Sequence, residues 1–357
     1  MSFRVFKYAS PLLVYFGALL SFLGSGFVVW IPLLYAFLLI PLLELLLRPD
    51  SRNLSEAEAE LARRNRLYDA LLYAIVPLQW GALLLFLWQL RLPWSAADLA
   101  GKTAVMGLLC GTFGINVGHE LGHRTRRGER LAAKSLLLTS LYMHFYIEHN
   151  RGHHKHVATP GDPSSAGYGE SLYAFWLRSV TGSLRSAARI AGAAARKAGR
   201  PALSLHNELL QFGLIEAALL SAVALLFGAK ALLVFLAAAT MGFLLLETVN
   251  YIEHYGLQRR PAKDGGAGYE RARPAHSWNS SHVIGRVMLF ELSRHSDHHY
   301  LASRPYQLLR HHEEAPQMPT GYPGMMLLAL LPPAWFAVMN PRVQKNSRPE
   351  EPAMVIA

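Results

Sequence analysis

Histidine is the residue type whose number and spacing in this chain point to chemistry. Nine of the sixteen histidines fall into four groups. In chain order the groups are His119 and His123; His149, His153 and His154; the single His254; and His295, His298 and His299. Residues three or four apart share one face of a helix, so most of these histidines could direct neighbouring imidazoles toward one point. Neutral imidazole is a common ligand of protein-bound metals.

The number of imidazoles bears on the number of ions. A zinc site normally takes four ligands, and a catalytic one takes three plus water, so nine are too many for one ion. We therefore expect two neighbouring metal ions with four or five imidazoles each. Spacing does not choose among Zn, Cu, Fe and Ni. Taken alone, His119-Glu120-Leu121-Gly122-His123 also matches a zinc hydrolase motif with Glu120 as general base.

Carboxylates near these groups are candidates for orienting the ligands. Metal-bound histidines usually donate their second ring N–H to a carboxylate. Glu247 lies seven residues before His254, and Asp297 lies inside the last group. We expect these two to accept such hydrogen bonds, with Glu247 also able to relay protons. Three further carboxylates could serve in the same way: Glu148, Asp162 and Glu253.

Long apolar blocks predict the elements that must carry these groups. The 357 residues are 52% hydrophobic and only 17% charged, below the soluble average of about 25%. We predict an all-α, polytopic membrane protein with one domain, 1–357, and a histidine-rich cap. Its six spans lie at about 10–28, 27–47, 68–90, 101–120, 208–229 and 230–252. An apolar piece at 322–340 is broken by Pro332-Pro333 and is expected at the membrane interface.

The distribution of charge predicts the orientation of these spans. The formal net charge is +11, and Lys and Arg crowd the N-terminus, the 48–66 loop, 119–200 and the region after 254. Under the positive-inside rule both termini and the segments 119–207 and 253–320 are cytoplasmic. Basic charge beside apolar blocks indicates membrane lipid rather than nucleic acid. The basic segment 178–200 either faces lipid headgroups or docks an acidic electron carrier.

The cysteine content constrains any redox chemistry. Cys110 is the one cysteine, and it lies within an apolar stretch. An iron–sulfur cluster or a rubredoxin-type Cys₄ site within this chain is therefore excluded. If the reaction consumes electrons, a separate protein must deliver them.

Longer strings around the histidines resemble one family. These strings are Glu148-His149-Asn150-Arg151-Gly152-His153-His154, Val157-Ala158-Thr159-Pro160, Asn250-Tyr251-Ile252-Glu253-His254-Tyr255-Gly256 and Arg294-His295-Ser296-Asp297-His298-His299. In them the chain resembles the bacterial integral-membrane alkane monooxygenases, within the membrane desaturase and hydroxylase superfamily, and the resemblance runs from about residue 10 to 315. The chain departs from the family's usual pattern at Arg124, Gly161, Leu292-Ser293 and Tyr300, none of which removes a histidine.

The resemblance implies a specific activity. It implies two non-haem irons held by the nine histidines, with O₂ as co-substrate and a primary alcohol formed from a terminal methyl. It implies electrons from a separate rubredoxin, recharged by a reductase, and a location in the bacterial inner membrane. We expect the apolar substrate to enter from the lipid between the spans. Hydroxylation of another apolar methyl substrate (xylene-like or terpene), fatty-acyl desaturation and zinc-dependent hydrolysis remain alternatives.

Overall fold

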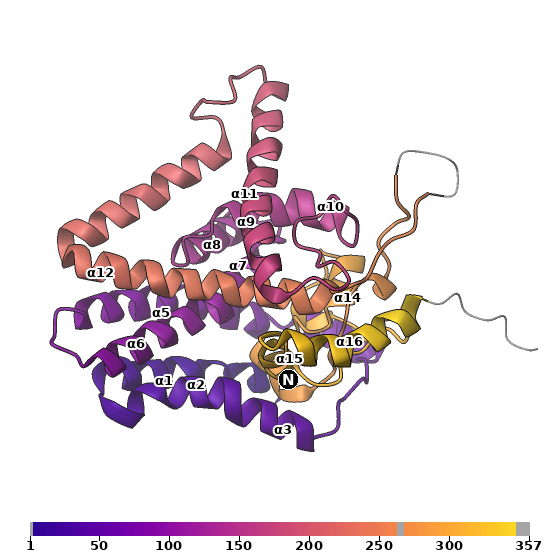
Figure 1. The fold of residues 1–357 in the computed structure, drawn as a ribbon, viewed down its shortest axis with the longest axis horizontal. Helices are drawn as coiled ribbons and strands as arrows, with labels where there is room; N and C mark the ends of the chain where they lie inside the picture. The colour runs from indigo at the N-terminus through magenta and orange to yellow at the C-terminus, as the bar shows by residue number, and fades with distance from the viewer. Residues whose placement is uncertain (1–2, 263–267, 348–357) are drawn as a thin grey trace, which may run out of the picture.

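The computed structural model describes residues 3–262 and 268–347. Within these ranges the regular elements are all helices, and outside the helices two isolated bridges pair Pro261 with Tyr269 and Asn279 with Gln317. The predicted all-α class is confirmed. Figure 1 shows several long helices lying side by side, with shorter helices and loops gathered near one end of the bundle.

The N-terminal apolar block forms a helical hairpin whose two arms correspond to the spans predicted at about 10–28 and 27–47. Gly26 makes the turn with a φ of +64°, and its N–H donates to Asp98 Oδ1 at 2.7 Å. Glycine suits this position because it adopts positive φ without a Cβ clash. The elements are η1 (Phe3–Ala9), α1 (Leu12–Leu23), η2 (Gly26–Trp30), α2 (Ile31–Leu34), η3 (Tyr35–Leu39) and α3 (Ile40–Leu46).

The central helices continue from a short polar helix, α4 (Glu56–Arg64), into α5 (Leu67–Gln89). Ser95 caps the next helix by accepting from the Asp98 N–H at 3.0 Å. From there α6 (Ala96–Leu109), the π-helical η4 (Cys110–Ile115) and α7 (Asn116–Gly122) follow without an intervening loop. The run carries His119 on its last helix.

The 47-residue α12 (Glu208–His254) contains a break at Gly228, whose backbone is non-helical with φ +87°. This break lies beside the boundary predicted between the spans at 208–229 and 230–252. Figure 1 shows the two halves meeting at a sharp angle, and the second half leads to His254.

The remaining helices are mostly short. They are α8 (Arg127–Leu138), α9 (His144–Glu148), η5 (His149–His153), α10 (His154–His156), α11 (Leu172–Lys197), η6 (Pro274–His276), α13 (Val283–Met288), α14 (His295–Tyr300), η7 (Tyr306–Leu308), α15 (Tyr322–Ala329) and α16 (Pro332–Ser347). The predicted interfacial piece at 322–340 corresponds to α15 and most of α16. Its side chains Tyr322, Met325 and Trp335 are fully buried in one core with Tyr251 of α12.

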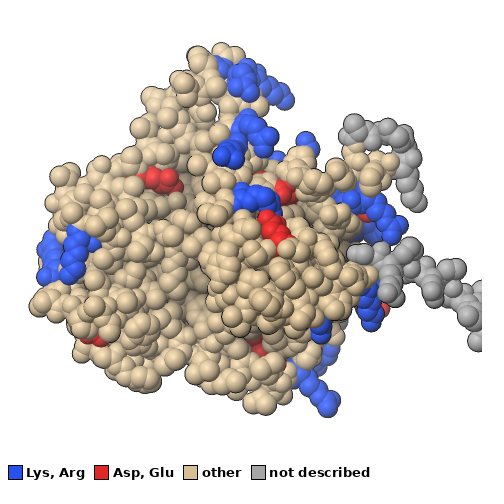
Figure 2. All heavy atoms as spheres, in the orientation of Figure 1, with Lys and Arg blue, Asp and Glu red and all other residues tan. Residues whose placement is uncertain are grey.

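Surface composition identifies a membrane protein. Within 3–262 and 268–347, four helical stretches are long and apolar enough to cross a membrane: Arg4–Leu23, Gly26–Leu46, Leu67–Gln89 and Glu208–His254. Large apolar side chains on them are exposed, including Leu45 at 69% and Leu225 at 85%. In Figure 2 most of the visible face is uncharged, and Lys and Arg gather mainly around α11 and near the end with α14 and α16. Such exposed apolar area needs lipid.

A close glycine contact joins the two helical runs that carry His119 and His254. A Cβ added to Gly242 would lie 2.5 Å from Cys110 Cβ, and one added to Gly111 would lie 2.9 Å from the Gly242 carbonyl oxygen. Small residues let helix backbones approach in this way. The contact sets the spacing of α7 and the end of α12, and therefore of the histidines they hold.

Candidate metal centre

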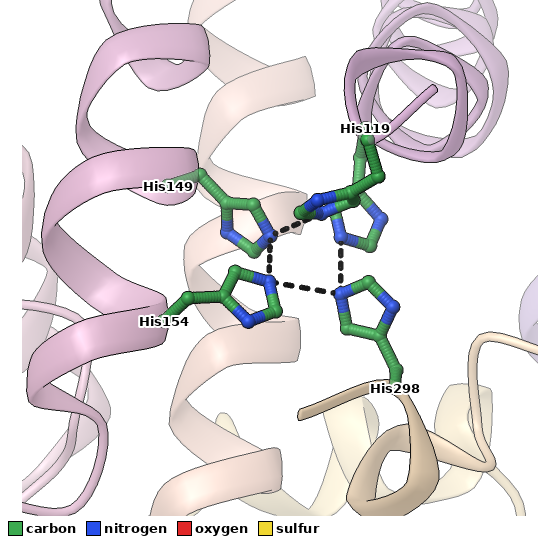
Figure 3. A group of neighbouring side chains, drawn as sticks. His119, His149, His154 and His298 are labelled. Atoms are coloured by element: carbon green, nitrogen blue, oxygen red, sulfur yellow. Dashed lines mark hydrogen bonds between the residues drawn. The ribbon is translucent and has the colours of Figure 1, made fainter. Parts of the chain in front are cut away.

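All nine histidines predicted from spacing converge in the structure. Among the described residues they form two groups that could each hold an ion, with the potential ligand atoms of each group within 4.8 Å of one another. The five-histidine group is His119, His123, His149, His154 and His298, and the four-histidine group is His153, His254, His295 and His299. Figure 3 shows His119, His149, His154 and His298 directing their rings toward a common centre from three separate stretches of the chain.

Local helix geometry decides which histidine joins which group. His149 and His153 lie in the π-helical η5, followed directly by His154. With the wider turn, His149 and His154 meet in the five-histidine group while His153 points to the other. On α14, adjacent residues differ in direction by about 100°. His298 and His299 therefore face different groups, and His295 joins His299.

The nitrogens of each group are closely spaced. In the five-histidine group the Nε2 atoms of His119 and His298 are 2.9 Å apart. His154 Nε2 lies 3.0 Å from His149 Nε2 and 3.1 Å from His298 Nε2. His149 Nε2 is also 3.1 Å from His123 Nε2. In the four-histidine group His299 Nε2 is 2.9 Å from His295 Nε2 and 3.2 Å from His153 Nε2.

Hydrogen bonds among the rings do not account for this spacing. In a neutral imidazole one ring nitrogen carries the proton and donates, and the other only accepts. His154 Nε2 contacts two other Nε2 atoms, each of which contacts a further one. A shared cation accounts for it directly. Two nitrogens bound at about 2.0–2.1 Å and at right angles lie about 2.9 Å apart.

The electrostatic setting keeps these rings able to bind metal. Burial, followed by the neighbouring imidazoles, lowers the pKa of His149 and of His298 well below the usual range. Burial and adjacent histidines act in the same direction on the pKa of His154. The rings are neutral at physiological pH, so their lone pairs are free for a cation.

Asp162 orients one ligand candidate. His153 Nδ1 is 2.8 Å from Asp162 Oδ2, and both side chains are buried. Burial disfavours the charged imidazole, but the Asp162 carboxylate outweighs it and raises the pKa of His153. This contact places the proton on Nδ1 and leaves Nε2 facing the four-histidine group. Asp162 was one of three further carboxylates considered for this role from the sequence.

The two carboxylates expected first in that role lie elsewhere. Glu247 accepts from Tyr142 at 2.7 Å and from Asn250 at 3.3 Å. Seven residues of α-helix rise about 10.5 Å, which leaves Glu247 too far from the His254 ring. Asp297 projects from the opposite face of α14 to its histidines. It accepts from His312 at 2.7 Å, from the Arg310 N–H at 2.8 Å and from Arg304.

Glu120, the general base of the zinc hydrolase motif, lines a small cavity together with His119 and His298. Its carboxylate accepts from Arg124 at 2.7 Å and from the Tyr306 N–H at 3.3 Å. Both contacts use Oε1 and tie Glu120 to the neighbouring loop.

An apolar cavity adjoins the five-histidine group. It is a partly open cavity of about 80 Å³ between the N-terminal hairpin, α6, η4, the end of α12, α13 and α15, with Ala36, Leu108 and Met326 in its lining. A smaller cavity contacts His119 and His298, and Asn116 and Leu292 line both cavities. Sequence reasoning missed Asn116, because one polar residue at a helix end carries no pattern, and it noted Leu292 only as part of a departure from the family's usual string.

A basic depression opens on the other side of the same group. The half-buried His123 lines it, together with Arg124, Arg127, Arg130, Lys134 and Arg151. Glu208 is the one acidic residue in this lining and contacts Lys134 and Arg151.

Comparison with known proteins agrees with this architecture. Residues 93–329 match the family model described as "Fatty acid desaturase". The chain is 42% identical over 325 residues to alkane 1-monooxygenase 2 of Pseudomonas aeruginosa, covering 90% of this chain and 86% of that protein. It is 38% identical over 307 residues to the alkane 1-monooxygenase of Acinetobacter baylyi, covering 86% of this chain and 74% of that protein.

A more distant relative is the hydroxylase component of xylene/toluene monooxygenase from Pseudomonas putida, 30% identical over 268 residues and covering 73% of this chain and 70% of that protein. The fold and the paired histidine groups define a membrane-bound oxidoreductase of the desaturase and hydroxylase class. Within that class the chain belongs to the alkane monooxygenase family.

The His153–Asp162 contact predicts a loss of metal affinity in Asp162→Asn. Removing the negative charge weakens the orientation and basicity of His153, and such changes typically cost about 10- to 100-fold in affinity. Metal retained after dialysis against graded chelator measures this. Glu170→Gln, in the same loop but contacting Arg178, is the control. Equal retention by both variants would show that Asp162 does not support a ligand.

Proposed function

We propose that this chain is a non-haem diiron monooxygenase that converts the terminal methyl of an alkane to a primary alcohol, using O₂ and two electrons. The observation that carries the proposal is the pair of histidine groups beside an apolar cavity. Relatives named alkane 1-monooxygenase support the reaction and the substrate class.

We assign the nine histidines as iron ligands, five at one ion and four at the other. The converging nitrogens fit cations, and imidazole suits iron among several metals. A pair of irons supplies the activation of O₂ needed to attack a strong aliphatic C–H bond. In balance, R–CH₃, O₂, two electrons and two protons give R–CH₂OH and water.

The protein's own residues position the substrate. The cavity presents apolar side chains that bind an alkyl chain and exclude water. Asn116 and Leu292 line the passage toward His119 and His298, so the terminal methyl would reach the five-histidine group there. When the alkyl chain is held close to the reacting centre, the reaction gains the rate advantage of proximity.

The topology we propose is one domain with six spans in the bacterial inner membrane. The run from α6 to α7 and the two halves of α12 supply three of them, beside α1, the stretch from η2 to α3, and α5. The positive-inside distribution then puts both termini and the metal centre on the cytoplasmic side. The 119–207 and 253–320 segments form the catalytic cap.

Electrons would come from a separate rubredoxin, recharged by a reductase, because a single buried cysteine cannot build a Cys₄ site. A docking place must bring the donor near a ligand. The basic depression at His123 does so, whereas the basic residues of 178–200 lie on the exposed face of α11. We therefore place the donor at the depression.

Product analysis under ¹⁸O₂ tests the function. We expect the protein, supplied with rubredoxin, reductase and NADH, to form 1-alkanols carrying one ¹⁸O atom from a panel of C₆ to C₁₆ alkanes. An unlabelled alkene would indicate a desaturase instead. Labelled benzyl alcohols from xylenes with no alkanol would favour the activity named for the Pseudomonas putida relative.

Filling the cavity should change substrate preference. Ala36→Phe adds a ring to its lining, so kcat/KM should fall for hexadecane by about tenfold or more relative to hexane, since pocket fit discriminates on this scale. Leu84→Phe, on an exposed face of α5, should leave the ratio unchanged. A parallel fall for all chain lengths would mean that the cavity does not hold the alkyl chain.

Charge reversal locates the electron donor. Arg127→Glu with Arg130→Glu should raise the KM for rubredoxin by about tenfold at low salt, and the effect should shrink at high salt because electrostatic steering is screened. Turnover at saturating donor should persist. Arg185→Glu with Arg189→Glu on α11 is the matched pair. If the KM for rubredoxin rises only in the Arg185→Glu with Arg189→Glu variant, the donor docks on the 178–200 segment.

A further inference from the structure

Asn116 is a polar residue at the junction between the apolar cavity and the five-histidine group. It begins α7, three residues before His119, and is 7% exposed. It lines the apolar cavity and also the small cavity that contacts His119 and His298. A terminal methyl that reaches the five-histidine group along this passage therefore meets the Asn116 carboxamide.

The carboxamide of Asn116 keeps hydrogen-bonding capacity for a ligand. Its Nδ2 donates to the Leu289 carbonyl oxygen at 3.1 Å. Because a carbonyl oxygen only accepts, this contact identifies the nitrogen end of the amide. Within residues 3–262 and 268–347 it is the one hydrogen bond of the Asn116 side chain. The Oδ1 acceptor and the second N–H therefore remain for a ligand in the passage.

The Leu289 contact also fixes the direction of this amide. Leu289 follows the last residue of α13 and itself lines the apolar cavity. With its nitrogen held on that carbonyl, the side chain of Asn116 directs its oxygen away from Leu289. A fixed acceptor loses little freedom when a ligand binds, which favours affinity.

The other polar groups of the cavity are less suited to a ligand at the metal centre. The cavity lining has three hydroxyl-bearing side chains: Tyr35, Thr112 and Tyr322. The two tyrosine hydroxyls already contact Met288 Sδ at 3.7 Å and Glu253 Oε1 at 2.7 Å. Thr112 precedes Asn116 by four residues and so lies about one helical turn further from His119. Among the described polar side chains of this lining, Asn116 alone also lines the small cavity at the histidines.

An alkane and its terminal alcohol differ at this point by one hydroxyl. The alkane makes no hydrogen bond and gains nothing from a carboxamide. A hydroxyl in an apolar cavity is separated from water and needs a partner, because an unpaired buried polar group is costly.

We propose that Asn116 forms a subsite for the product, in which Oδ1 accepts a hydrogen bond from the hydroxyl of a 1-alkanol whose C1 lies at the five-histidine group. The inference rests on the proposed function and deepens it. The cavity would hold the alkane by its chain alone, and the primary alkanol by its chain and its head group. A 1-alkanol would then bind more tightly than the alkane of equal length and compete with it.

Ligand displacement without turnover tests the subsite. Iron-loaded, full-length protein in nanodiscs, without an electron donor, binds tritiated dodecane, which is displaced by unlabelled dodecane or 1-dodecanol. We expect Asn116→Leu to weaken 1-dodecanol by about tenfold or more relative to dodecane, because the hydroxyl loses its partner. Asn116→Asp gives up the donor to Leu289 but keeps an acceptor oxygen, so it should retain most of the preference for 1-dodecanol.

Thr112→Val is the matched control. It should leave the ratio of the two affinities unchanged, because an alkanol with its hydroxyl at Asn116 presents methylene groups to Thr112. Asn116→Ala gives the same measurement if Asn116→Leu does not fold. An unchanged ratio at Asn116, an equal weakening of both ligands, or a fall confined to Thr112→Val would overturn the subsite. Failure of the proposed function differs from these results, since the wild type would then form no ¹⁸O-labelled alkanol whatever the displacement ratio.

Discussion

The arrangement depends on one electrostatic constraint: nine imidazoles, of which seven are buried and two are half-buried, cannot point their nitrogen lone pairs at one another without a cation between them. Nε2 atoms lie 2.9–3.2 Å apart in both groups, and neutral rings have too few protons to bridge every contact. In an interior of low polarity this repulsion is costly unless charge compensates it. Metal binding and the packing of the helix ends are therefore coupled.

The helices that meet at this point come from distant parts of the chain. The glycine contact at Gly111 and Gly242 brings the α6–α7 run against α12, so His119 and His254 end at the same level. The segment that holds His149 and His153 is the π-helical η5. Such π-helical turns are frequent at functional sites. Helix α14 then contributes to both groups. The apolar cavity beside this assembly and the basic depression on its other side separate the proposed substrate path from the proposed electron path.

Sequence patterns predicted much of this, for identifiable reasons. Apolar blocks predicted the two N-terminal spans that meet near Gly26 and the boundary at 229–230 beside Gly228, because an apolar run much longer than about 20 residues must divide into separate spans. Histidine spacing predicted which residues would converge. It could not allocate them, because it assumed α-helical geometry where η5 is π-helical. Sequence distance also misplaced Glu247 and Asp297, since facing direction and helical rise decide contact. The contacts of Asp162 and Glu253 depend on how loops and α15 fold back, and that information is tertiary.

The central claim is that two separate ions occupy these two groups. Anomalous scattering from crystals of the iron-loaded protein, collected on both sides of the iron K edge, tests it most directly. The account predicts two iron peaks, one surrounded by His119, His123, His149, His154 and His298, and the other by His153, His254, His295 and His299. A single peak, or peaks away from these rings, would contradict it.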